Sequence, residues 1–256
     1  MLKVLMRNSL KREFNAKINF FIRLVTDIVW YSCSMLFFEV IYATTIGIGD
    51  WSIEQIHLFL GVSFVVDSLH MSFFYFNTMQ LPYLVRMGEI DRILLYPIDS
   101  FVYASVQNID FSSFISGVFG VWLIVKSLID MKINVSLLRI IIFIVLILCG
   151  VLTMKSILFI IGELTFFLGN TEHLLEIVFD IFQFGMKPEC IYDERTKRGI
   201  TYIIPLLLIA NFPSKFICSN LDVFEVIWSV TVMSCLLLLS KILWKVGLIH
   251  YSGTTM

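Results

Sequence analysis

Long uninterrupted apolar segments constrain this chain more than any other feature. Residues 140–148 have the sequence IIIFIVLIL, and hydrophobic residues make up 58% of the 256 positions, with a mean hydropathy of +0.88. A soluble domain of this length needs no such runs to build its core, whereas a helix that crosses a bilayer needs about 20 apolar residues. The sequence therefore predicts an all-α integral membrane protein.

The apolar segments predict about six transmembrane helices in a single domain, residues 1–256. Five of them are clear, at about 18–46, 56–79, 101–127, 136–168 and 222–246. The fourth is longer than a straight crossing, so we expect it to tilt, to kink near Gly150 or to project beyond the membrane. Lys and Arg crowd the first segment and return near the end of the last. By the positive-inside rule, both termini face the cytoplasm and the number of crossings is even.

The beginning of the chain has the pattern of an amphipathic helix. Apolar residues recur every four positions on one side, and basic residues recur on another: Leu2, Met6, Leu10 and Phe14 against Lys3, Arg7 and Lys11. A cationic helix with an apolar stripe lies in the headgroup region. We expect residues 1–16 to form an interfacial helix; the alternative is a cytoplasmic overhang of the first span.

Residues 169–221 allow two topologies. In the first, residues 171–199 stay cytoplasmic and the chain crosses outward at 200–219, which charge counting favours. In the second, residues 172–186 cross outward, 187–199 lie outside, and 200–218 form a re-entrant hairpin. Pro205 and Pro213 favour the second, because prolines break helices. Cys190 and Cys218 would be able to form a disulfide if both faced an oxidising compartment.

A charged island separates the second and third apolar segments. Residues 86–100, RMGEIDRILLYPIDS, carry charges of alternating sign ahead of an apolar run, between Pro82 and Pro97. This layout is typical of a short amphipathic helix outside the bilayer that offers one face to a protein partner. We expect residues 80–100 to form a cytoplasmic loop that connects this chain to another protein.

Motifs for enzyme chemistry are missing from the sequence. It contains no G-x-x-x-x-G-K-[ST] phosphate loop, no H-E-x-x-H and no G-x-S-x-G, and its four histidines and five cysteines lack metal-ligand spacing. The net charge of −1 gives no basic stripe for nucleic acid. We expect a chain that is not an enzyme by itself and binds no cofactor or metal.

Ionisable residues within apolar spans are costly, so they are candidate functional sites. The candidates are Asp67, His70, Asp110, Lys155 and Glu163, with Asp27 and Glu39 in the first span. Asp67 and His70 are three residues apart on one helix face, which suits a proton relay. Hydrogen bonding between helices is the simpler explanation. For Lys155 we expect a structural ion pair with Glu163 or with an acid on a neighbouring span.

Three motifs resemble the permease subunits of bacterial ATP-binding cassette exporters of the type-2 class. GEIDRILLYP, residues 88–97, resembles their loop after the second span, with Ile93 in place of a Leu. GLIHYSG, residues 247–253, resembles their closing sequence. Residues 188–213 resemble their Pro-x-x-Ile-Tyr segment and the helix after it, although Asp193 stands where many relatives have Pro. The resemblance covers the whole chain and favours the second topology, with 187–221 as an outer re-entrant segment.

The resemblance implies a fold, a function and partners. In such exporters a cytoplasmic coupling helix, here within residues 84–95, docks into a groove of a separate ATP-binding subunit, which holds the ATP and magnesium. The implied contact residues are Arg86, Gly88, Glu89, Asp91, Arg92 and Leu95. The resemblance further implies a second permease, as a homodimer or a related heterodimer, in the lipid of a bacterial inner membrane.

Two other functions fit the sequence. One is a secondary transporter driven by an ion gradient through the buried acids and His70. The other is a membrane partner of an ATPase that transports nothing, such as an immunity or sensor subunit. The cargo of an exporter stays open, because drug, peptide, lipid and glycan carriers share one architecture.

Overall fold

The computed structural model describes residues 7, 9–11, 17–44, 51–133, 135–202, 204–218 and 223–251, and its regular elements within these ranges are all helices. They are α2 (Lys17–Thr44), α3 (Ile53–His70), η1 (Met71–Tyr75), α4 (Phe76–Arg86), α5 (Ile90–Leu94), α6 (Ser100–Val106), α7 (Phe111–Asp130), α8 (Leu137–Glu163), α9 (Thr165–Leu168), α10 (Glu172–Gly185), η2 (Glu189–Ile191), α11 (Glu194–Tyr202), α12 (Leu207–Cys218) and α13 (Val223–His250). The prediction of an all-α protein is confirmed.

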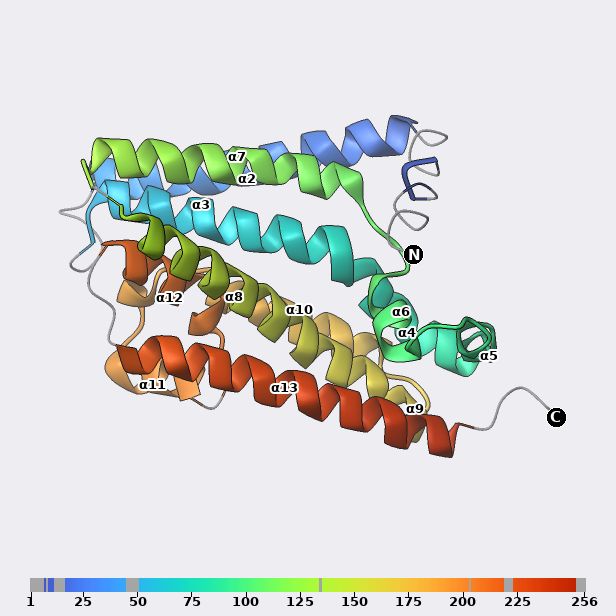
Figure 1. Ribbon diagram of the computed structural model, residues 1–256. Coiled ribbons are helices and arrows are strands. Elements are labelled where there is room, and N and C mark those ends of the chain that lie inside the picture. The colour runs from blue at the N-terminus through green and yellow to red at the C-terminus, as the bar shows by residue number, and fades with distance from the viewer. Residues whose placement is uncertain are drawn as a thin grey trace.

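The long helices lie lengthwise beside one another in a bundle (Figure 1). The start of α2, the short helix α5 and the last turns of α13 lie at one end of this bundle, which we call the α5 end. Helices α11 and α12 lie toward the opposite end, the α11 end. Helix α10 begins beside α9 and leads toward the α11 end. The second predicted topology, in which residues 172–186 cross the membrane, requires this course.

Five helical segments of the described chain are long and apolar enough to cross a membrane. They are α2, Ile53–Arg86, α7, Leu137–Leu168 and α13. The pair α11 and α12, bent by 109°, makes a sixth if it counts as one broken span. This agrees with about six predicted crossings, and it supports a multi-pass membrane protein.

Glycines bring α3 and α7 close together at the centre of the bundle. A Cβ added to Gly61 would lie 2.9 Å from the carbonyl oxygen of Gly120, and a Cβ on Gly120 would lie 2.8 Å from that of Gly61. Small residues let membrane helices approach until their backbones touch, and van der Waals packing then stabilises the pair. Helix α3 is thereby buried between its neighbours, which positions its polar residues inside the bundle.

The third predicted span needs correction, whereas the fourth is confirmed as Leu137–Leu168 without the kink that was one of its alternatives. Residues 101–127 are not one helix: α6 ends at Val106, and α7 begins at Phe111 after a break. Helix α8 continues through Gly150 without interruption and ends at Glu163. A Cβ on Gly150 would lie 2.4 Å from the carbonyl oxygen of Ile209, so this glycine provides room for α12 instead of a kink.

Other predicted features lie partly or wholly outside the described residues. The interfacial helix at residues 1–16 is described only at Arg7 and residues 9–11, and the last residues of the GLIHYSG motif are not described. Cys190 and Cys218 are not joined by a disulfide in the structure.

Candidate functional site at the α5 end

The charged island forms a short helix whose two faces differ. Ile90 and Ile93, three residues apart, are 0% and 1% exposed, whereas Leu95 is 84% exposed. Asp91 and Arg92 are also exposed. Residues three apart share one side of a helix, so α5 anchors an apolar side in the protein and presents charged and apolar groups outward.

The turn before α5 depends on a glycine. Gly88 has φ of 73°, a left-handed conformation that costs residues with a Cβ about 1 kcal/mol or more. The chain reverses here, and the backbone N–H of Glu89 donates to the carbonyl of Leu84 at 2.9 Å. Within the island, Arg92 and Glu89 form an ion pair at 3.3 Å. The glycine and these contacts together fix where α5 leaves α4.

Beneath α5 lies an apolar cluster that joins four other helices, α4, α6, α8 and α13. Its buried members are Leu81, Leu84, Val85, Ile90, Ile93, Ala104, Phe159 and Trp244. The indole of Trp244 on α13 donates to the hydroxyl of Ser100 on α6 at 3.0 Å. A displacement of α5 must therefore disturb the packing of two spanning helices, because well-packed cores tolerate little deformation.

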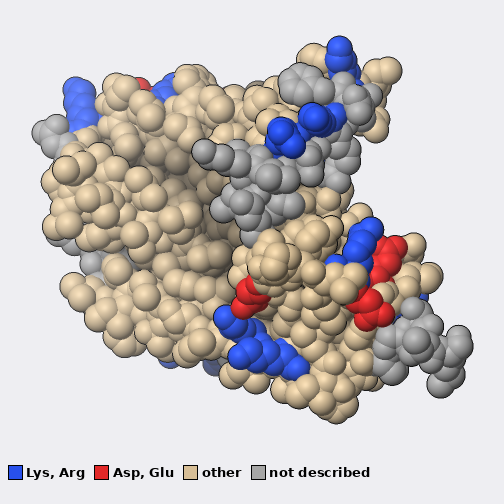
Figure 2. All heavy atoms as spheres, turned by 45° about the vertical axis from the view of Figure 1, so that its right-hand side comes forward, with Lys and Arg blue, Asp and Glu red and all other residues tan. Residues whose placement is uncertain are grey.

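Ion pairs connect the same region to α10 and α13. Arg86, the last residue of α4, pairs with Glu172 at the start of α10. Lys241 on α13 lies 3.4 Å from Asp99. Burial would raise the pKa of Asp99, but the backbone N–H of Val102 and the Lys241 ammonium hold it below its usual value. Figure 2 looks toward this end, where acidic and basic side chains gather on an otherwise mostly uncharged surface.

The end of α13 reaches α5 through Tyr251. Partial burial raises the pKa of the Tyr251 phenol, and the negative charge of nearby Asp91 raises it further. Tyr251 also packs against the apolar cluster beneath α5. The described part of the closing GLIHYSG motif and the charged island, far apart in sequence, are thus neighbours in the structure.

The break between α6 and α7 interlocks with the π-helix η1. The side-chain amide of Asn77 donates to the carbonyl of Asn108 at 2.9 Å and accepts from the N–H of Asn108 at 2.9 Å. The N–H of Asp110 donates to the carbonyl of Ser72, within η1, at 2.9 Å. A π-turn leaves carbonyls for partners outside the helix and is frequent at functional sites. These bonds fix the second span to the start of α7.

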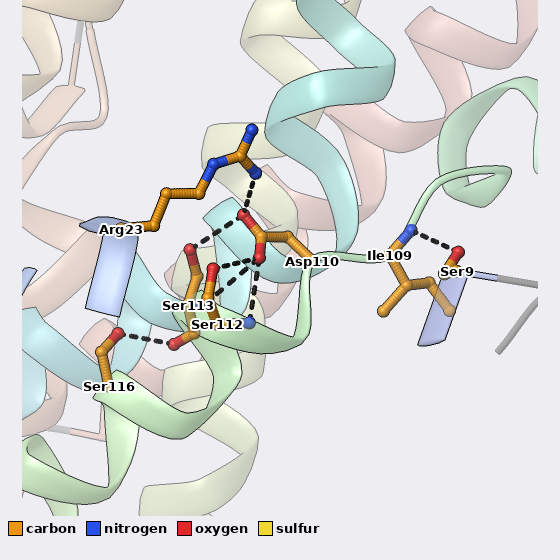
Figure 3. Close-up of polar contacts among 7 residues, drawn as sticks. All are labelled: Ser9, Arg23, Ile109, Asp110, Ser112, Ser113 and Ser116. Carbon is orange, nitrogen blue, oxygen red and sulfur yellow. Dashed lines mark hydrogen bonds and ion pairs between the residues drawn. The ribbon is translucent and has the colours of Figure 1, made fainter. Parts of the chain in front are cut away.

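Asp110 caps α7 and does not lie within a span, which corrects its predicted place. Its carboxylate accepts from the N–H groups of Ser112 (3.0 Å) and Ser113 (3.5 Å) and pairs with Arg23 of α2 at 3.0 Å (Figure 3). Aspartate before a helix followed by polar residues is a capping signature that the sequence already contained. Next to it, the N–H of Ile109 donates to the hydroxyl of Ser9 at 3.2 Å.

The structure does not join Asp67 to His70. The hydroxyl of Tyr31 on α2 donates to Asp67 at 3.2 Å. His70 is 0% exposed, and neither ring nitrogen has a hydrogen-bond partner in the described part of the chain. The geometry therefore provides no proton relay between these two side chains.

The ion pair predicted for Lys155 is absent among the described residues. Its ammonium lies over the rings of Phe101 and Phe159, 4.1 and 4.2 Å from their centroids. Glu163 instead accepts from the hydroxyl of Ser240 on α13, at 3.1 and 3.2 Å. Cation–π contacts satisfy a buried ammonium without a carboxylate. Phe159 follows Lys155 by four residues on α8, so helical spacing indicates this neighbour. Phe101 and Ser240 lie on other helices and were not identifiable from sequence spacing.

The described residues contain no group of His, Cys, Asp or Glu that could hold a metal ion. What they define is a multi-pass helical membrane protein with an anchored helix outside its spanning segments. The chain belongs to the ABC-2 family of transporter proteins, whose family model matches residues 28–255. No match was found among curated proteins or among solved structures. ABC-2 membrane subunits typically work with an ATPase on a separate chain.

Proposed function

We propose that this chain is the permease subunit of an ATP-driven exporter and that α5 couples it to an ATP-binding subunit. The contact surface consists of Glu89, Asp91, Arg92 and Leu95, with Arg86 and Gly88 fixing its position. Nucleotide binding can shift the permease between states only through contacts that differ between those states. In this proposal, α5 makes those contacts.

The observation that carries the proposal is the two-sided burial of α5. Its inner side belongs to a cluster shared with α4, α6, α8 and α13. Its outer side holds charges and an 84% exposed Leu95, which the described chain leaves uncovered. Leu94 and Tyr96 on either side of Leu95 are also exposed, and an exposed apolar patch beside charged groups is typical of a protein contact. A force applied there would reach α8 and α13 through this cluster.

The proposal includes an orientation and an assembly. The α5 end faces the cytoplasm of a bacterial cell, with both chain termini, and residues 187–221 form the outer re-entrant segment. A second permease copy, or a related permease, and two ATP-binding subunits complete the exporter. Helix α10 leads from α9 toward the α11 end, so α11 and α12 lie opposite α5, as this arrangement requires.

Charge reversal at α5 tests the coupling. The permease and candidate ATP-binding subunits from its own genome are co-expressed, and permease-dependent ATPase activity is measured for wild type, Glu89→Lys and Asp91→Lys. We expect both variants to insert in the membrane but to lose co-purification and stimulation. Glu194→Lys is the matched control, since Glu194 is 75% exposed and lies at the opposite end of the bundle.

Full stimulation by both α5 variants would refute this assignment of the coupling helix. Transport that survives ATP depletion and collapses with the ion gradient would instead establish a secondary transporter. An ATPase that binds the permease but never responds to any cargo would indicate the immunity or sensor role.

A further inference from the structure

A pocket of about 300 Å³ opens between α2, α3 and the end of α10. It lies along the middle of the spanning helices, away from the apolar cluster beneath α5. Its lining includes the acids Asp27 and Asp67, and it has aromatic walls from Trp30, Tyr31, Phe38, Phe64 and Phe179. Pockets of this size, mostly apolar with a few polar groups, are typical of small-molecule sites.

The two carboxylates of the pocket have hydroxyl groups as neighbours and form no ion pair among the described residues. Asp67 accepts the Tyr31 hydroxyl, and Asp27 lies near the hydroxyl of Ser116. Neither acid forms an ion pair among the described residues, and Arg23, one turn before Asp27, is held by Asp110. Carboxylates at membrane depth are expensive unless a positive charge compensates them.

Ser63 gives an independent indication of a ligand. It lines the pocket and is 4% exposed, and its hydroxyl has no hydrogen-bond partner within the described residues. A buried hydroxyl without a partner costs about 1–3 kcal/mol. A bound molecule with a polar group would remove that cost.

The charges of the lining residues indicate the charge of the ligand. Lys187 also lines the pocket, so ionised Asp27 and Asp67 leave one negative charge in excess. The aromatic rings provide apolar area and, for a cation, favourable contacts with their faces. The two carboxylates and the aromatic walls of the pocket together match a molecule with a charged head and an apolar body.

We propose that this pocket binds a monovalent amphipathic organic cation, with its charge at Asp67 and Asp27 and its apolar part against the aromatic walls. The binding site itself does not depend on an ATPase. That such cations are the exported cargo rests on the proposed function above.

Equilibrium binding to the purified full chain, in an uncharged maltoside detergent without ATPase, tests the site. Tetraphenylphosphonium and tetraphenylborate have the same shape and opposite charge, so their difference isolates electrostatic selection. We expect tetraphenylphosphonium to bind and tetraphenylborate to bind at least tenfold more weakly. Asp67→Asn and Asp27→Asn, on separate helices, should each weaken tetraphenylphosphonium binding about tenfold, because each removes one of the two negative charges that face the bound cation.

Asp180→Asn is the matched control, because Asp180 is exposed on α10 and does not line the pocket. Equal binding of the two probes, or equal affinities of all three variants and wild type, would overturn the proposal. Binding without any ATP-dependent export of these cations would leave the site intact and refute them as the cargo.

Discussion

Replacement of Ile93 by Ala should release α5 from the bundle. Ile93 is 1% exposed within the cluster that also contains Leu84 and Trp244. Loss of its outer carbon atoms removes buried area and leaves a cavity, at a combined cost of about 3 kcal/mol. If this cost falls on the attachment of α5, the detached population rises roughly a hundredfold.

Hydrogen–deuterium exchange of residues 88–98 measures that population, because amides in a locally opening segment exchange at rates set by its free energy of opening. The N–H of Tyr96, which donates to the carbonyl of Ile93 at 3.3 Å, is one reporter. Leu95→Ala is the matched control: the side chain is 84% exposed, so exchange should stay within about twofold of wild type. Unchanged exchange in Ile93→Ala would show that ion pairs and the Gly88 turn, not apolar packing, hold α5.

Three further predictions concern the bundle, each measured by thermal stability on size-exclusion chromatography in detergent. Gly61→Val should destabilise the protein by about 1–3 kcal/mol or more, because even a Cβ added to Gly61 would lie 2.9 Å from the Gly120 carbonyl oxygen. An unchanged thermal midpoint would contradict the close contact between α3 and α7. Asp110→Ala should lower the free energy of unfolding by about 1–2 kcal/mol, because α7 loses its N-terminal cap, and Asp110→Asn should lower it less. Equal thermal midpoints for the Ala and Asn variants would argue against capping. Lys155→Met should be neutral or stabilising, since no carboxylate of the described residues forms an ion pair with the ammonium; a large loss would show that the charge of Lys155 stabilises the fold.

Local pattern was sufficient to predict the short helix at the α5 end. The island's alternating charges and apolar run lie within residues 86–100, so the helix follows from nearby residues. The left-handed turn at Gly88 and the burial of Ile90 and Ile93 came only from the structure. The break before α7 was missed because residues 101–127 are apolar enough for a span. Asp110 with Ser112 and Ser113 was the available signal, and it was interpreted as an acid inside the membrane.

Contacts between distant residues required the tertiary structure. The sequence predicts that Lys155 pairs with Glu163 or with an acid on a neighbouring span. Packing against α6 instead places the Phe101 ring at the ammonium, beside Phe159 of α8 itself, and packing against α13 places Ser240 at the carboxylate of Glu163. The same holds for Asp67, which has Tyr31 of another helix as its partner.

The sequence by itself determined that this chain is an all-α membrane protein with one charged helix outside its spans. The reason is that membrane insertion depends on the length and apolarity of contiguous segments, which need no knowledge of neighbours. Only the tertiary structure decided which polar groups meet, where α5 is anchored, and that two acids share a pocket with aromatic walls. Those facts depend on how helices rotate and approach one another, and close contacts such as Gly61 with Gly120 fix that geometry.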